Sequence, residues 1–227
     1  MKKLIYLGLC VFLLSSCETA KKFTREGNYP AMYAEKPATI LIMPPINRTV
    51  NVEAKEYFYT SLAAPLCEKG YYVISPFLAM ETLKSESAYD AEMFLEGNLA
   101  PFRNVFGADA ALFTIINEWK KSTIGNTIKV NIEYILKSTT NNEILFNRKG
   151  TLTVDLSINS SSAGILGVLV DMAASAIATA ATDKVVAARR CNSFSLYDLP
   201  DGKYSSKFEL DQKTPADGKE FHATVKQ

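Results

Sequence analysis

The residue with the clearest chemistry in this sequence is Cys17, which ends the segment Leu14-Ser15-Ser16-Cys17. An apolar residue, two small residues and a cysteine form the bacterial lipobox, in which the thiol is alkylated by a diacylglyceryl group. Two lysines and an apolar run of eleven residues, Leu4–Leu14, precede it. This run is shorter than the roughly 20 apolar residues of a membrane-spanning helix and is typical of a secretory signal.

Residues 1–16 are therefore predicted to be a lipoprotein signal peptide, so that the mature chain begins at a lipidated Cys17. Its amine can take a further acyl chain such as palmitate, and two or more chains anchor a protein stably. The expected location is the cell envelope. Glu18 stands where an aspartate often marks inner-membrane retention, which favours the outer membrane, facing the periplasm. The alternative is an ordinary cleaved signal with an incidental cysteine.

Two further cysteines, Cys67 and Cys191, belong to the mature chain. An exported protein can join such a pair in a disulfide, because the envelope can be oxidising. The alternative is two buried free thiols. We favour the free thiols, because nothing in the sequence brings their Cα atoms within bonding range.

The only histidine is His222, near the C-terminus. A catalytic triad based on histidine or a histidine-rich metal site is therefore not expected, and no Gly-rich phosphate loop occurs. Removal of residues 1–16, which contain two lysines and no acid, leaves 23 basic and 24 acidic side chains. Such a balance gives no sign of nucleic-acid binding. The sequence predicts a protein that is not an enzyme and needs no metal or cofactor.

Three other residues occupy places where a sheet could hold a ligand. Pro45 and Asn47 follow a predicted strand at 39–43, and Asp109 precedes another at 110–116. Open α/β sheets bind ligands beside the ends of their strands, so these residues are candidate ligand or partner contacts. The structural alternative, which we favour, is that the prolines stop a strand while Asn47 and Asp109 bond to turn backbone.

The elements that would position these residues follow the order β-α-β-α-α-β-β-β-α. Apolar runs predict buried strands at 39–43, 71–74 and 110–116. Helices are expected at 52–69, 76–84 and 88–105, and Pro65 predicts a break near Ser61. The prediction is one α/β domain at 38–199 with a mixed sheet and helices packed on it. A tether at 17–37 precedes it, and a polar, mobile tail at 200–227 follows.

Residues 127–158 alternate between apolar and polar side chains, which predicts a long antiparallel hairpin with one dry face and a turn near Asn141. The members of the predicted dry face are Ile128, Val130, Ile132, Tyr134, Leu136, Ile144, Phe146, Leu152, Val154, Leu156 and Ile158. An Ala-rich helix is predicted at 164–190. Its composition favours burial in a core or a subunit interface over a membrane span.

Three segments carry a resemblance to a known family. They are Ile40-Leu41-Ile42-Met43-Pro44-Pro45-Ile46-Asn47, Ala64-Pro65-Leu66-Cys67-Glu68-Lys69-Gly70-Tyr71-Tyr72-Val73 and Phe106-Gly107-Ala108-Asp109-Ala110-Ala111-Leu112. In this order they resemble a family of bacterial lipoproteins typified by a Neisseria vaccine-candidate antigen. The resemblance spans about residues 38–190 and leaves out the C-terminal tail.

The resemblance implies a fold similar to the N-terminal domain of TolB and the periplasmic domain of the curli-secretion lipoprotein CsgG. It also implies a non-enzymatic accessory or scaffold in envelope assembly or transport, with CsgG-like partner lipoproteins or as a homo-oligomer. Two alternatives are a small-ligand binding domain at the strand ends and a subunit of a CsgG-like secretion pore.

Overall fold

The computed structural model describes residues 23–122, 126–157 and 172–226, with the side chains of the last helix described from Asp183 onward. Several predictions lie outside these residues. They concern the signal peptide at 1–16, the lipidation site Cys17 and the first residues of the predicted helix at 164–190. Everything below refers to the described residues.

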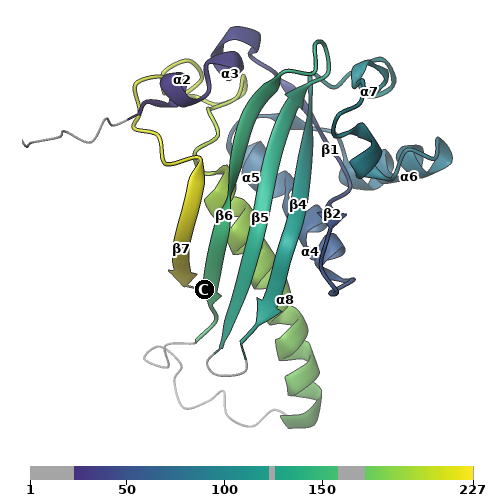
Figure 1. Ribbon diagram of the computed structural model, residues 1–227, viewed down its shortest axis with the longest axis vertical. Coiled ribbons are helices and arrows are strands. Elements are labelled where there is room, and N and C mark those ends of the chain that lie inside the picture. Colours follow the sequence, from purple (N-terminus) through teal and green to yellow (C-terminus); the bar gives the residue numbers. More distant parts are fainter. Residues whose placement is uncertain (1–22, 123–125, 158–171, 227) are drawn as a thin grey trace, which may run out of the picture.

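A single mixed sheet of seven strands organises the chain, in the order β3-β1-β4-β5-β6-β7, with β2 paired to β4 (Figure 1). Strand β1 lies parallel to β3 and β4, whereas β4, β5 and β6 form an antiparallel meander. The strands are β1 (Thr39–Ile42), β2 (Ile46–Asn47), β3 (Tyr72–Val73), β4 (Ala110–Lys121), β5 (Thr127–Ser138), β6 (Ile144–Asp155) and β7 (Glu220–Lys226). The predicted α/β fold class with a mixed sheet and a long hairpin is confirmed, whereas the likeness to TolB and CsgG stays a prediction.

The alternation along β5 and β6 produces the predicted dry face. Ile128, Val130 and Ile132 are fully buried on β5, and Leu152 and Val154 are fully buried on β6. The prediction is wrong for Ile144, which is 53 % exposed, while its neighbour Leu145 is buried. A register shift between Leu136 and Lys137 explains this, because one irregular pairing turns the side chains that follow to the other face.

Helices cover the two faces of the sheet unequally. On one face lie α4 (Ala54–Ser61), α5 (Ala63–Glu68) and α8 (Met172–Leu196), which pack on the larger core. On the other, α6 (Pro76–Ser85), the 3-10 helix η1 (Ala91–Phe94) and α7 (Ala100–Phe106) cover only the half of the sheet near β1 and β4. The predicted break before Pro65 is present, since the chain leaves α4 at Ser61 and starts α5 at Ala63.

The structure differs most from the sequence predictions at the two ends of the described chain. The tether predicted at 17–37 contains α2 (Arg25–Asn28) and α3 (Pro30–Glu35), and Tyr29 between them is buried. The tail predicted to be mobile at 200–227 instead wraps past α2 and ends in β7, which pairs in parallel with β6 (Figure 1). Two of its carboxylates, Asp201 and Asp211, are bonded inside the protein, as described next.

Candidate functional site

Asp109 lies immediately before β4 and connects it to β1. Its Oδ2 accepts hydrogen bonds from the backbone N–H groups of Ala38 and Thr39, at 3.0 Å each. Its Oδ1 lies 3.4 Å from Nη1 of Arg103. This backbone-bonding arrangement is the structural alternative that the sequence favoured. The same carboxylate also borders a surface hollow of about 430 Å³.

Pro45 and Asn47 lie at the other end of the same strand region. Pro45 is buried, and the Asn47 side chain donates to the carbonyl of Asn51 and accepts from Thr49. Asn47 aligns with Ile116 on β4, seven residues beyond Asp109. At the rise of a strand, that separation is about 23 Å. The structure therefore does not bring Asn47 and Asp109 together in one ligand site, contrary to the small-ligand alternative.

The two cysteines are free thiols in different surroundings, so the disulfide considered from the sequence is absent. Cys191 is fully buried on α8, as expected, and burial raises the pKa of its thiol to about 12. Cys67 is exposed on α5, so the expectation that it is buried is wrong. A helix of six residues with one face on the core leaves its opposite face to solvent.

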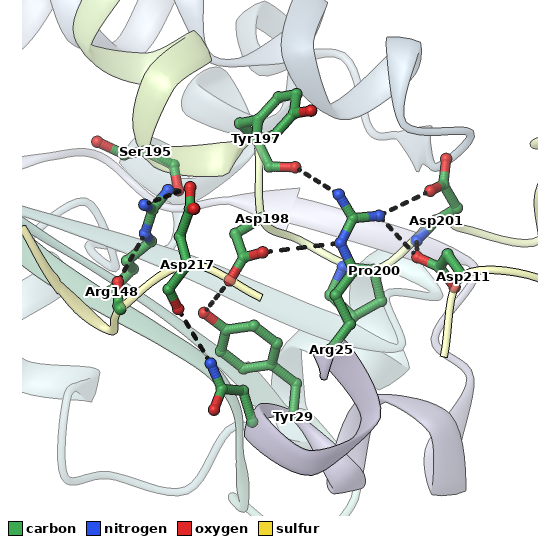
Figure 2. A network of polar contacts seen from close by, with 12 residues as sticks. Arg25, Tyr29, Arg148, Ser195, Tyr197, Asp198, Pro200, Asp201, Asp211 and Asp217 are labelled. Carbon is green, nitrogen blue, oxygen red and sulfur yellow. Dashed lines mark hydrogen bonds and ion pairs between the residues drawn. The ribbon is translucent and has the colours of Figure 1, made fainter. Parts of the chain in front are cut away.

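The most elaborate polar arrangement surrounds Arg25 (Figure 2). The Arg25 side chain is buried, and its Nη1 lies 3.0 Å from Asp211 and 3.2 Å from Asp201. Its Nη2 donates to the carbonyl of Tyr197, and its Nε lies 3.7 Å from Asp198. Backbone bonds add to these contacts, because Arg25 N–H donates to Thr214 and Ala216 N–H donates to Phe23. We call this joining of residues 23–29 to residues 197–217 the clasp.

A second arginine extends the clasp to the sheet. Arg148 on β6 is 1 % exposed and stacks against the rings of Phe194 and Phe221. Its guanidinium donates to the carbonyls of Phe194 and Ser195 at the end of α8 and pairs with Asp217 at 3.1 Å. Arg148 thus fixes α8 and the chain leading into β7 on the same strand.

The pKa values of two carboxylates in the clasp shift in opposite directions. Burial acts to raise the pKa of Asp211, but bonds from the Asp201 N–H, Arg25 and Tyr33 outweigh it and hold the pKa below its usual range. Burial dominates at Asp198 and raises its pKa, although Tyr29 donates a 2.9 Å hydrogen bond to it. The clasp is therefore an ionic structural joint.

Sequence reasoning missed the clasp, although one signal was available. Arg148 occupies an even-numbered position between Phe146 and Leu152, on the face that alternation predicts to be dry. A charge at such a position requires a buried partner. The acids that provide it could not be identified, because they lie in a segment with no apolar periodicity.

Helices α6 and α7 leave β5, β6 and β7 uncovered on this side of the sheet (Figure 1). The side chains that these strands present here are mostly polar. We call it the open face and define it by Lys129, Asn131, Glu133, Thr151 and His222. Asn131 donates to Thr151 at 3.0 Å, and Thr151 aligns with His222 on β7. A hollow of about 220 Å³ lies here, beside Gly150. The open face thus offers amide, hydroxyl and charged groups on a rigid, flat support.

The described residues contain neither a group of ligands for a metal ion nor a helix able to cross a membrane. No three or more His, Cys, Asp or Glu side chains in them are placed to hold a metal ion. None of the helices they form combines the length and the apolar character required to cross a membrane.

Comparison with known proteins shows a family to which this chain is similar. The profile of the family described as "Putative lipoprotein GNA1162-like" matches residues 27–199. The chain is 32 % identical over 187 residues to a protein of Neisseria meningitidis serogroup B described as "Putative lipoprotein NMB1124/NMB1162". That alignment covers 81 % of this chain and 85 % of the Neisseria protein. Arg25, Asp201 and Asp211 lie outside the family match, whereas Tyr29 and Asp198 lie inside it, so the clasp joins segments that overlap the two ends of the matched region.

Solved structures show more distant similarity. The crystal structure of lipoprotein GNA1162 from Neisseria meningitidis has 23 % identity and a TM-score of 0.48, and covers 66 % of this chain and 99 % of its own. A PelC dodecamer from Paraburkholderia phytofirmans has 16 % identity and a TM-score of 0.41, with coverages of 71 % and 87 %. The LpoB C-terminal domain from Salmonella enterica has 13 % identity and a TM-score of 0.35, with coverages of 56 % and 96 %.

Proposed function

This chain belongs to the GNA1162-like lipoprotein family, and we propose that it is a membrane-anchored, non-enzymatic accessory of the cell envelope. A lipid on Cys17 holds it at the membrane. The domain faces the periplasm, from the outer membrane in preference to the inner one. It acts by binding a protein partner, either a second copy of itself or another envelope lipoprotein.

The observation that carries this proposal is the open face. Every strand that contributes to it is packed on the core through its other face, so its polar side chains are held on a rigid sheet. Its exposed groups are mixed in sign, because Lys129 and Lys149 alternate with Glu133 and Glu220. A polar, flat surface with both charges matches the polar character of protein–protein contacts that form and separate.

The exposed edge of β7 adds to this surface. Among the described residues, β7 pairs only with β6, and its burial alternates from Glu220 to Lys226. An unpaired strand edge can accept a strand from a partner through main-chain hydrogen bonds. The exposed lysine and glutamate side chains along it restrict such pairing to a partner with matching charges.

Photocrosslinking in intact cells tests the open face. A photoreactive amino acid replaces Thr151 on the open face or Thr60 on α4, which is exposed on the opposite side of the sheet. We expect crosslinked species of higher mass from position 151 and only monomer from position 60. Monomer alone from both positions, with the protein correctly localised, would contradict the proposal.

Labelling tests the lipid anchor separately. We expect the wild-type chain to incorporate labelled palmitate and enter the detergent phase on Triton X-114 partition. The Cys17→Ser variant should do neither. Equal labelling of both chains would show that Cys17 is not the lipidated residue.

A further inference from the structure

The clasp fixes the position of the membrane relative to the domain, provided that Cys17 carries the lipid as proposed above. Phe23 is held by the hydrogen bond that Ala216 donates to its carbonyl, at 2.7 Å. Phe23 is only six positions along the chain from Cys17. Even fully extended, six residues span about 21 Å, which is roughly half the width of a domain of this size. The bilayer must therefore lie on the side of the molecule that carries Phe23.

We infer that this side is a membrane-contacting surface whose partner is a bilayer with anionic headgroups. We define the surface by Phe23, Tyr197, Lys207, Leu210 and Lys213, and call it the anchor-proximal surface. Tyr197, Lys207 and Leu210 surround a hollow of about 440 Å³ whose lining includes Arg25 and Thr214. Lys213 precedes Thr214, the backbone partner of Arg25, and lies opposite Glu26 in the antiparallel pairing of the clasp.

Three large apolar side chains are exposed on this surface. Leu210 is 77 % exposed, Tyr197 is 65 % exposed and Phe23 is 59 % exposed. These three side chains come from three separate parts of the chain and are brought together by the clasp. Tyrosine, phenylalanine and leucine beside lysine make the composition favoured at the headgroup boundary of a bilayer.

The clasp also turns some charged side chains of its C-terminal segment inward and leaves others exposed. Residues 200–219 contain four lysines and four acids, so the segment is formally neutral. However, Asp201 and Asp211 turn inward to Arg25, and Asp217 pairs with the buried Arg148. Four lysines of the segment, including Lys207 and Lys213, remain exposed, against two exposed acids, Glu209 and Asp217. The outward charge is thus more positive than the sequence suggests, and each lysine near an anionic surface contributes about 1 kcal/mol of attraction.

Fluorescence quenching by brominated lipid tests this inference. The lipidated full-length protein is reconstituted in phosphatidylethanolamine–phosphatidylglycerol vesicles that contain a dibrominated phospholipid. A tryptophan replaces Leu210 or, as a matched control, Leu78, which is 63 % exposed on α6 across the sheet (Figure 1). The native Trp119 is buried and serves as a constant background. We expect the emission of L210W to fall by about half and that of L78W to stay nearly unchanged, because only the former lies at headgroup depth.

The charge contribution is tested in the same vesicles. In the L210W background, Lys207→Glu with Lys213→Glu should reduce the quenching, whereas Lys55→Glu with Lys120→Glu should not. Quenching of L210W no stronger than that of L78W, in chains that float with the vesicles, overturns the inference and leaves the lipid anchor intact. Chains that do not float overturn the anchor and the inference together, so flotation distinguishes the two failures.

Discussion

Arg25 and Arg48 show how burial changes the contribution of an ion pair to the stability of the protein. Arg25 is 6 % exposed and contacts three carboxylates and a carbonyl, whereas Arg48 pairs with Glu92 in a position where both side chains are more than half exposed. Water solvates the partner of an exposed arginine when that arginine is removed. It cannot do so for Asp211, which is 4 % exposed.

We therefore predict that Arg25→Ala destabilises the protein by about 3–5 kcal/mol, because it leaves buried carboxylates without a counter-charge. Arg48→Ala should change the free energy of unfolding by at most about 1 kcal/mol. Urea unfolding of the non-lipidated full-length chain measures both values. Equal, small effects of the two substitutions would show that the Arg25 contacts do not persist in solution.

The sequence predicted the surroundings of some individual residues and not those of others. The turn-bonding alternative for Asp109 and the burial of Cys191 followed from local patterns, and the structure shows both. The partners of Arg25 did not, since Asp201 and Asp211 lie 176 and 186 positions away. No local pattern encodes a contact of that range.

Among the elements, β7 depends on a glycine in its neighbour. Gly150 on β6 aligns with Phe221, and a Cβ at this position would lie 2.1 Å from the Phe221 carbonyl oxygen. Backbone atoms cannot move aside as the end of a flexible side chain can. Strand β7 therefore requires glycine at position 150.

We predict that Gly150→Ala displaces β7 while the β4–β5–β6 meander persists. Hydrogen exchange measures this, and amides of residues 221–226 should lose at least about tenfold protection, whereas those of β5 should keep theirs. Thr151→Ala is the control, because its side chain points to the open face. Unchanged protection of β7 in Gly150→Ala would contradict the close pairing of β6 and β7.

Elements with strong local signals were predictable, and those defined by distant contacts were not. Continuous apolar runs located β1 and β4, and alternation located β5 and β6. Pro65 located the break between α4 and α5. In contrast, α2, α3 and β7 are short segments without a strong local signal, and packing against distant parts of the chain gives them their structure.

The whole molecule differs from a domain with free ends because the clasp joins its two terminal segments. We predict that trypsin leaves the lysines of residues 200–219 uncut in the native protein, although they are exposed. Arg25→Ala should accelerate cleavage there at least about tenfold, since proteolysis follows the population of the opened segment. Arg48→Ala is the control. Rapid cleavage of the wild type in this segment would restore the original expectation of a mobile tail.

The distance in sequence between the two halves of the clasp also sets an order of events in folding. Synthesis proceeds from the N-terminus, so Arg25 exists long before Asp211 and β7 do. The β4–β5–β6 meander can form from neighbouring residues, whereas contacts between distant residues form slowly because a long loop must close first. The clasp is thus expected to close last. Until then, the chain that leads from Cys17 is not held against the domain, which gives modifying enzymes a period of access that ends when folding is complete.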